Sequence, residues 1–490
     1  MRSSGILMPV SALPSRYGIG TIGKEAFEFI DFLASCGQRY WQILPVGPTG
    51  FGDSPYQSFS AYAGNPYLID PEELSECGLL TSSEIAESGF FEDPDSVDYG
   101  DLYEKRFNLL EKATARISHN DADFQNFCAV NAEWLDDYAL FMALKSEHNM
   151  ESFHCWPDRY RIYSEQMAEE VTLKYEEDIH YWSALQYLFY GQWENLKKYA
   201  GERDIKIIGD IPIYVSPDSS DLWANHKLFQ VNKSGDMTFV AGCPPDYFNE
   251  DGQLWGNPLY NWNYHRNQDF DWWVKRIKHA EKIFDVVRID HFRGFAGYYS
   301  IPAESKTAKI GKWKRGPGKR FISKIKEEAP DIKIIAEDLG YMTPDVQRLL
   351  KFSGFPGMKV LQFAFDGSPD NGHLPHLHTE NNIVFTGTHD NTTLSDWVET
   401  ALPEEIEFAV EYLKVSKEEE LTDAIIEAAM KSVCDICIIP IQDWLGMGVE
   451  ARINTPAVPE DNWKFRVRKD ALSAETAKKI LIMTKDGNRC

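Results

Sequence analysis

Residues 285–290 read Asp285-Val286-Val287-Arg288-Ile289-Asp290, an apolar and β-branched stretch that ends in a carboxylate. The same layout recurs in Lys333-Ile334-Ile335-Ala336-Glu337 and in Lys206-Ile207-Ile208-Gly209-Asp210. Runs of this kind, without strict alternation of polar and apolar residues, are typical of parallel strands that are covered on both faces. The carboxylates are therefore expected at the carboxyl edge of a parallel sheet.

Eight stretches of this type occur along the chain, with helical patterns between them. Residues 25–36, for example, place Phe27, Ile30 and Leu33 at helical spacing, and Gly37 follows as a stop signal. Eight strands that alternate with helices favour an α/β fold of the closed (β/α)₈ TIM-barrel type over an open sheet. The predicted strands are residues 5–9, 41–45, 206–210, 285–290, 333–337, 359–363, 383–387 and 437–441.

The intervals between the predicted strands are uneven, which predicts insertions within a single catalytic barrel of residues 1–490. About 160 residues separate the second strand from the third, far more than a helical crossover needs. Residues 71–201 are expected to form a helical insertion, because side chains such as Leu185, Leu188 and Phe189 share one helix face. Residues 216–282 are rich in aromatic residues, Pro and Asn, and are expected to form a loop-rich insertion over the active face.

The charge balance excludes some classes of partner. The chain holds 76 acidic and 50 basic residues, which gives a net charge of −26. Nucleic acids and anionic membranes both require a positive surface, so neither is an expected partner. A neutral ligand such as a sugar is indifferent to this charge. The 13% of aromatic residues would suit stacking on sugar faces, although large cores use aromatic residues as well.

The cysteines and the N-terminal sequence bear on the compartment. Eight cysteines are scattered along the chain and do not resemble the disulfide framework of a secreted domain. A strand is expected within a few residues of Met1, which leaves no room for a signal peptide, and no apolar run reaches membrane-spanning length. We therefore expect a cytoplasmic protein with reduced thiols.

Three motifs resemble cofactor or metal sites but lack the necessary context. Residues 18–23 match G-x-G-x-x-G, but Pro14 and Ser15 separate them from the first strand, and the second strand ends without an acidic residue. Cys434 and Cys437 form a lone C-x-x-C pair, which supplies too few ligands for zinc. A solvated loop is expected for His373, His376 and His378. We predict no metal and no cofactor.

Four carboxylates follow predicted strands: Asp210, Asp290, Glu337 and Asp390. In barrel enzymes the carboxyl ends of the strands build the active site. Like charges repel when they are gathered there, so this arrangement requires either nearby cations or a chemical purpose. An ion-pair network at the barrel rim and a divalent-metal site are the alternatives to catalysis.

The residue types fit the cleavage of a glycosidic bond. Cleavage with retention needs two carboxyl groups about 5–5.5 Å apart, one as nucleophile and one as proton donor. Arg288 and Asp290 share one strand face, where the arginine charge would keep Asp290 ionised. Glu337 ends an apolar strand, where burial would raise its pKa toward that of a general acid. His389 and Asp390 could bind sugar hydroxyl groups as positive charge develops on the ring.

Together with further motifs, these residues resemble the amylomaltases, or 4-α-glucanotransferases (disproportionating enzymes), a branch of the α-amylase clan. The resemblance extends over nearly the whole chain, and the order of the motifs makes it specific. The motifs are GILMP (5–9), SALP (11–14), GIG (18–20), SPYQSFS (54–60), GNPYL (64–68), GDIPIY (209–214), GCPPDYF (242–248), QLWGNP (253–258), RIDHFRGF (288–295), AEDLG (336–340) and TGTHDN (386–391).

The resemblance implies a role for each residue of the catalytic motifs. Asp290 resembles the family's nucleophile and Glu337 its general acid and base. Asp390 resembles the residue that stabilises the transition state by holding ring hydroxyl groups. Arg288 and His389 resemble the pair that orients the substrate.

Further residues are implied to bind substrate. Asp210 resembles a supporting carboxylate, and His291 lies in the same motif as the nucleophile. Tyr56 resembles the aromatic residue that stacks under the donor sugar. Residues 244–256 resemble a mobile loop over the acceptor site, with Asp246, Tyr247 and Trp255 as its binding residues. For Tyr56 and Trp255, core packing is the alternative.

The activity implied by the resemblance is 4-α-glucanotransferase. A segment of α-1,4-glucan is transferred with retention to a maltooligosaccharide, through a covalent glucosyl-enzyme on Asp290 and without a cofactor. One alternative is an α-glucan hydrolase, which would use the same carboxylates with water as the acceptor. The other is a non-catalytic glucan-binding protein, which should have lost a carboxylate, whereas all four are present.

Overall fold

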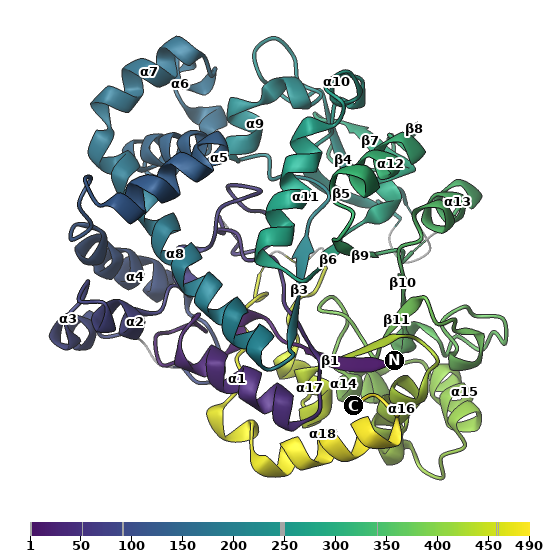
Figure 1. The fold of residues 1–490 in the computed structure, drawn as a ribbon. Helices are drawn as coiled ribbons and strands as arrows, with labels where there is room; N and C mark the ends of the chain where they lie inside the picture. The colour runs from purple at the N-terminus through teal and green to yellow at the C-terminus, as the bar shows by residue number, and fades with distance from the viewer. Residues whose placement is uncertain are drawn as a thin grey trace.

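The computed structural model describes residues 2–50, 52–90, 93–245, 250–340, 342–456, 458 and 460–490. Its centre is a sheet of eight parallel strands in the order β10-β11-β12-β1-β2-β3-β6-β9, which confirms the predicted (β/α)₈ barrel (Figure 1). The two outer strands approach each other, since the Ala336 N–H donates to the Pro356 carbonyl at 2.9 Å. The strands are β1 (Ser3–Leu7), β2 (Tyr40–Gln42), β3 (Lys206–Ile211), β6 (Val286–Ile289), β9 (Lys333–Ala336), β10 (Gly357–Val360), β11 (Asn382–Phe385) and β12 (Ile436–Pro440).

Each of the eight strands lies within a few residues of its predicted position, because their apolar side chains fill the two layers of the core. The sixth shows the largest shift: residues 359–363 were expected, whereas β10 ends at Val360 and Leu361–Phe363 form a short 3₁₀ helix. The apolar run continues past the edge of the sheet into this turn, so hydrophobicity alone places the strand too late.

The register of neighbouring strands sets the positions of the strand ends. In the β3–β6 pair, Asp210 lies opposite Arg288. In the β6–β9 pair, Ile289 lies opposite Ala336. Asp290 and Glu337 are the next residues along the chain, so they leave the sheet at the same level and on adjacent strands. The chemistry of these strand ends is therefore a consequence of sheet register.

Helices fill most of the interval between β2 and β3, and Figure 1 shows them to the left of the strands. Lys145 joins this region to the loop after β3, because its buried ammonium group lies 2.7 Å from the Asp218 carboxylate and 4.7 Å from the centre of the Phe59 ring. These contacts offset the cost of burying the charge. The helices are α2 (Pro71–Glu76), α3 (Ser82–Ser88), α4 (Tyr99–Thr114), α5 (Ala122–Glu147), α6 (Asp158–Arg161), α7 (Glu165–Lys174) and α8 (Glu176–Glu202).

A second sheet lies beside the barrel. It contains β4 (Phe239–Cys243), β5 (Gln253–Pro258), β7 (Gly297–Pro302) and β8 (Lys312–Arg315), in the antiparallel order β5-β4-β7-β8. Residues 216–282, expected to be rich in loops, thus contribute two strands together with α9 (Ser220–Ala224), α10 (Trp262–Asn267) and α11 (Asp271–Ile283). The sheet was missed because its strands are short and come from two separate stretches of sequence.

The remaining helices alternate with strands or follow the last one. The C-terminal segment holds the beginning of the barrel: the buried Arg489 guanidinium donates to the carbonyls of Ser3 at 2.9 Å and Cys434 at 3.0 Å. No helix in the described part of the chain combines the length and the apolar character needed to cross a membrane. These helices are α1 (Lys24–Ser35), α12 (Lys319–Glu328), α13 (Pro344–Ser353), α14 (Leu394–Thr400), α15 (Pro403–Leu413), α16 (Leu421–Lys431), α17 (Ile441–Leu445) and α18 (Ala474–Asp486).

Gly209→Ala is expected to destabilise the barrel. A Cβ atom at this position in β3 would lie 2.2 Å from the buried Phe284 ring, and overpacking of this kind costs about 1–3 kcal/mol. Gly191→Ala, on α8, is the matched control because its Cβ would meet nothing within 4 Å; its helix propensity changes stability by at most about 1 kcal/mol, in the favourable direction. Urea unfolding of both variants measures the difference, and equal midpoints would contradict the tight contact at Gly209.

Candidate active site

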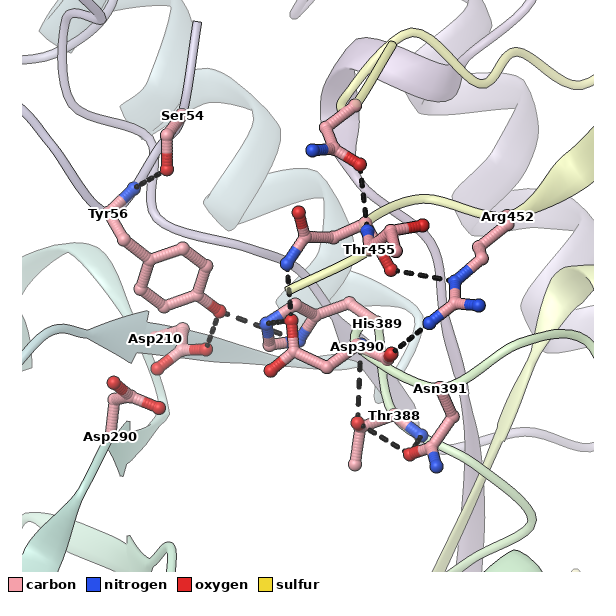
Figure 2. A network of polar contacts seen from close by, with 12 residues as sticks. Ser54, Tyr56, Asp210, Asp290, Thr388, His389, Asp390, Asn391, Arg452 and Thr455 are labelled. Atoms are coloured by element: carbon pink, nitrogen blue, oxygen red, sulfur yellow. Dashed lines mark hydrogen bonds and ion pairs between the residues drawn. The ribbon is translucent and has the colours of Figure 1, made fainter. Parts of the chain in front are cut away.

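The predicted catalytic carboxylates meet at the carboxyl ends of the barrel strands. Asp210 is the fifth residue of β3, Asp290 follows β6, and Glu337 follows β9. Asp390 lies in the loop after β11. Figure 2 shows Asp210 and Asp290 beside one another, with Tyr56 above Asp210 and Asp390 on the opposite side of the site.

Arg288 is the only cation that an ion pair joins to both Asp210 and Asp290 in the described residues. Its Nη1 donates to Asp210 Oδ2 at 2.5 Å, and its Nη2 donates to Asp290 Oδ1 at 3.0 Å. Its side chain is almost completely buried. Burial acts to lower the pKa of Arg288, but Asp210 and Asp290 outweigh it and raise this pKa well above its ordinary value. The arginine therefore stays charged and fixes both carboxylates.

Asp210 is buried and is a structural partner rather than a group open to substrate. Its Oδ2 accepts from Arg288 and also from the Tyr56 hydroxyl at 2.7 Å. Burial raises the pKa of Asp210, and the positive charge of Arg288 opposes this rise. Asp290, in contrast, is half-buried and faces the open side of the site.

Two backbone N–H groups hold the carboxyl group of Glu337. The N–H of His291 donates to Oε2 at 2.8 Å, and the N–H of Leu339 donates to Oε1 at 2.8 Å. Burial, followed by the negative charge of Asp290, raises the pKa of Glu337 to about 8. At neutral pH this group is therefore mainly an acid that can give up a proton.

His291 follows Asp290 directly and turns the chain toward Glu337. It has a φ of 51°, in the left-handed region that residues other than glycine rarely adopt. This turn directs its N–H at Glu337, one residue after Asp290. Its imidazole lies 4.8 Å from the Trp255 ring in an edge-to-face contact, and burial lowers its pKa to about 4. The neutral ring is a hydrogen-bonding group beside the site.

An aromatic wall borders the opposite side of the site. The rings of Tyr56 and His389 stack with centres 5.1 Å apart and planes 17° apart, and the Tyr56 hydroxyl lies 3.5 Å from His389 Nδ1. The Trp463 ring lies 5.9 Å from the Tyr56 ring and 6.1 Å from the His389 ring. Tyr56 is half-buried and bonded to Asp210, so it is a fixed surface next to the carboxylates.

Asp390 is held by residues that the sequence reasoning missed. Asn454 donates from Nδ2 to Asp390 Oδ1 at 2.6 Å, and Arg452 donates to the Asp390 carbonyl at 3.0 Å (Figure 2). His389 Nε2 lies 3.3 Å from the same carboxylate. Asn454 follows the eighth barrel strand, and loops after barrel strands carry site residues. That rule was the available signal, but Asn454 does not follow its strand directly as the predicted carboxylates do, because β12 ends at Pro440.

Of the three predicted loop residues, the structure describes only Trp255. Trp255 lies on β5, where its Nε1 donates to Gln253 Oε1 at 2.9 Å and its ring contacts His291. Asp246 and Tyr247 lie outside the described residues. The structure therefore brings together nine predicted residues, namely Tyr56, Asp210, Trp255, Arg288, Asp290, His291, Glu337, His389 and Asp390.

The cysteine and histidine motifs that resemble metal sites are not grouped as metal ligands in the described residues. Among the described residues, no three His, Cys, Asp or Glu side chains are grouped so as to hold a metal ion. Cys434 and Cys437 are both buried. The expectation of solvated histidines is wrong for His378, which is buried and lies 2.7 Å from the Ser432 hydroxyl through Nδ1. The nearby Gly and Pro residues indicate a loop, but they do not reveal that Ser432, which is distant in the sequence, packs against His378.

Comparison with known proteins gives one consistent result. A family model described as 4-alpha-glucanotransferase matches residues 8–472. The 4-alpha-glucanotransferase of Clostridium butyricum is 47% identical over 486 residues, which cover 99% of this chain and 100% of that protein. The 4-alpha-glucanotransferase of Thermus thermophilus is 43% identical over 500 residues and covers 100% of this chain and 99% of its own length.

Solved structures agree with these sequence matches. The amylomaltase from Streptococcus agalactiae in complex with acarbose has a TM-score of 0.97 and 40% identity, with 100% of both chains covered. The amylomaltase from Corynebacterium glutamicum shares the fold with a TM-score of 0.80 at 19% identity, over 99% of this chain and 75% of that one.

The carboxyl group of Glu337 is expected to titrate near pH 8, and at lower pH in the Asp290→Asn variant. Removing the negative charge of Asp290 removes a repulsion that disfavours the ionised glutamate, so its pKa must fall. NMR of protein labelled at the glutamate carboxyl carbons measures both values, and the Glu337→Gln spectrum assigns the signal. Titration of Glu337 near its ordinary value of 4.5 in the unmodified protein would contradict the proposed proton donor.

Proposed function

Because the chain belongs to the 4-alpha-glucanotransferase family, we propose that it transfers segments of α-1,4-glucan from a donor chain to an acceptor chain. Asp290 is the nucleophile, and Glu337 is the general acid and base. The observation that carries this assignment is the contrast between the two carboxyl groups. Asp290 forms an ion pair with Arg288 at 3.0 Å, whereas Glu337 is held by two backbone N–H groups and its pKa is raised to about 8.

In the first half-reaction a carboxylate oxygen of Asp290 attacks the anomeric carbon of the donor glucan. The bond from this carbon to the bridging oxygen breaks, and Glu337 gives its proton to that oxygen as the shortened chain leaves. A covalent glucosyl-enzyme with inverted configuration results. Because its pKa is raised, Glu337 carries the required proton at neutral pH, where an ordinary glutamate is ionised.

In the second half-reaction Glu337, now ionised, takes the proton from the 4-hydroxyl of an acceptor glucan. The oxygen of this hydroxyl attacks the anomeric carbon and displaces Asp290, which returns to its carboxylate form. The two inversions give net retention, so the new bond is again α-1,4. The pKa of Glu337 falls in the glucosyl-enzyme and rises again when the enzyme is released. Asp290 is uncharged while it carries the sugar, so it no longer repels the ionised glutamate.

The other site residues position the sugar. Asp390 binds ring hydroxyl groups and stabilises the positive charge that develops on the ring, and Asn454 fixes its carboxylate. His389 and Arg288 orient the donor, and Tyr56 supplies a flat surface beneath it. His291 and the loop residues Asp246, Tyr247 and Trp255 complete the binding set. Asp210 supports this set from below, because its buried carboxylate holds Tyr56 and Arg288. Residues 216–282, which include that loop, lie over the active face.

The substrates are α-1,4-glucans and maltooligosaccharides, which carry no charge and are compatible with the net charge of −26. Nucleic acids and anionic membranes are not partners, because the acidic chain repels them. We place the reaction in the cytoplasm, on the basis of the eight cysteines, all of which are free thiols. No cofactor takes part in either half-reaction.

Incubation with pure maltotriose is expected to give glucose and a ladder of longer maltodextrins, while the concentration of reducing ends stays constant. Transfer makes one glycosidic bond for each bond broken, whereas hydrolysis creates a reducing end every time. A bound acceptor can compete with water because it is held at a high effective concentration. Chromatography of the products, together with a reducing-end assay, distinguishes the two reactions.

Asp290→Asn is the control for this experiment and should lower the rate by orders of magnitude with an unchanged circular dichroism spectrum. Reducing ends that rise in step with glucose would make the protein a hydrolase. Constant reducing ends without a ladder would support the non-catalytic, glucan-binding alternative.

Glu337→Gln is expected to lose activity on natural glucans, by about a hundredfold or more, but to react with α-maltosyl fluoride. Fluoride leaves without a proton, so the first half-reaction no longer needs the acid. The second half-reaction lacks its base, so a maltosyl adduct should accumulate on Asp290 and appear as added mass on the intact protein. A variant that is equally inactive toward the fluoride and forms no adduct would remove Glu337 from this role.

A further inference from the structure

Trp313 is an exposed tryptophan next to the catalytic loop. It lies on β8, the edge strand of the small sheet, and 42% of it is exposed. Indole rings are costly to leave in water, and the described part of the chain contains no other tryptophan among its exposed large hydrophobic residues. An exposed ring of this size beside an active site indicates a binding surface.

Several contacts fix β8 to the segment that follows Asp290. The N–H of Gly316 donates to the Ala296 carbonyl at 2.9 Å, and the N–H of Gly318 donates to the Phe295 carbonyl at 2.9 Å. A Cβ atom on Gly316 would lie 2.3 Å from the Phe295 carbonyl oxygen, so the two backbones are in direct contact. The residues directly after β8 are therefore held against the catalytic loop, while β8 itself pairs with β7.

Arg293 contacts Trp313 and lies close enough to Glu337 for the two charges to interact. The guanidinium carbon of Arg293 lies over the Trp313 ring, 3.9 Å from its centre. The two residues before Arg293 both donate to Glu337. The backbone N–H of His291 donates to the side-chain oxygen Oε2 of Glu337 at 2.8 Å, and the backbone N–H of Phe292 donates to the Glu337 carbonyl at 3.1 Å. Burial lowers the pKa of Arg293, and Glu337 is among the groups that oppose this fall.

The contacts of the ring leave part of it open to a ligand, since 42% of Trp313 is exposed. Arg293 covers one face of the indole, and Tyr299 contacts it at 62° with ring centres 5.3 Å apart. Arg315, two residues further along the strand, shares the same side of β8. It is exposed, and no ion pair joins it to an acidic side chain in the described residues. A flat apolar face with a free hydrogen-bond donor nearby is the combination that a glucose unit requires.

We propose that Trp313 forms an outer binding position for the acceptor glucan, beyond the glucose unit whose 4-hydroxyl reacts. This inference rests on the proposed function, in which Glu337 acts on the leaving and the incoming chain. Both chains therefore leave the reaction centre on the Glu337 side. Arg293 lies on that side and contacts Trp313. A later glucose unit stacks on the exposed part of the Trp313 ring.

The test compares acceptors of increasing length with α-maltosyl fluoride as the donor. For Trp313→Ala, kcat/KM should fall by about tenfold for maltotetraose relative to glucose, mainly through a higher KM for the long acceptor. Glucose is too short to reach the ring. Trp313→Phe should restore much of the preference, because phenylalanine keeps a flat apolar face.

Phe352→Ala is the matched control. Phe352 is also an exposed aromatic residue, at 40%, but it lies near the end of α13, which leads back to the start of β10 at the opposite end of the barrel. This variant should keep the dependence on acceptor length. A Trp313→Ala variant that loses activity equally with glucose and maltotetraose would show a purely structural role through Arg293 and would overturn the proposal, as would an unchanged length dependence.

A binding measurement separates this inference from the proposed function. On the Asp290→Asn background, calorimetry with maltotriose and with a long maltodextrin reports affinity without turnover. Trp313→Ala should weaken the binding of the long maltodextrin about tenfold more than the binding of maltotriose. If the unmodified protein only hydrolyses α-maltosyl fluoride, transfer is refuted, but the calorimetric comparison still decides whether glucan contacts Trp313. Equal losses of affinity for the short and the long chain would exclude the outer position.

Discussion

The active site depends on the buried guanidinium of Arg288. One cation contacts two carboxylates, at 2.5 Å from Asp210 and 3.0 Å from Asp290. Burial of both Arg288 and Asp210 keeps water from weakening the first of these contacts. Breaking such a pair by removing one partner costs about 3–5 kcal/mol, because a buried charge is left without compensation. That is a large part of the stability of a typical protein. The arrangement of the neighbouring strands therefore cannot change without loss of the fold around the site.

The roles of the carboxyl groups follow from how that single positive charge is shared. Asp210 and Asp290 both contact Arg288, so their negative charges are compensated directly. Glu337 receives two backbone N–H groups instead. These cannot offset burial together with the repulsion from Asp290, so its pKa rises to about 8. Carboxyl groups at neighbouring strand ends thus differ through their partners, because two of them share a cation and the third does not.

The sequence predicts the barrel and its catalytic edge because both are encoded locally. An apolar run followed by a carboxylate specifies a strand and its end, and Asp210, Asp290 and Glu337 were identified in this way. Asn454 was missed because an asparagine in a loop carries no comparable local signal; only its contact with Asp390 reveals it. The small antiparallel sheet was missed for a related reason, since its pairing joins segments on both sides of β6.

The contacts of Arg489 have a consequence for the synthesis of the protein. Its guanidinium holds the carbonyl of Ser3, at the start of β1, and the carbonyl of Cys434, just before β12. Protein chains are made from the N-terminus, so β1 cannot pair with β12 or contact Arg489 until the residues between them have been translated. Until then the apolar edge of β1 is exposed, and such edges bind chaperones or aggregate. A nascent chain that stalls shortly before Arg489 would therefore keep its first strand poorly secured.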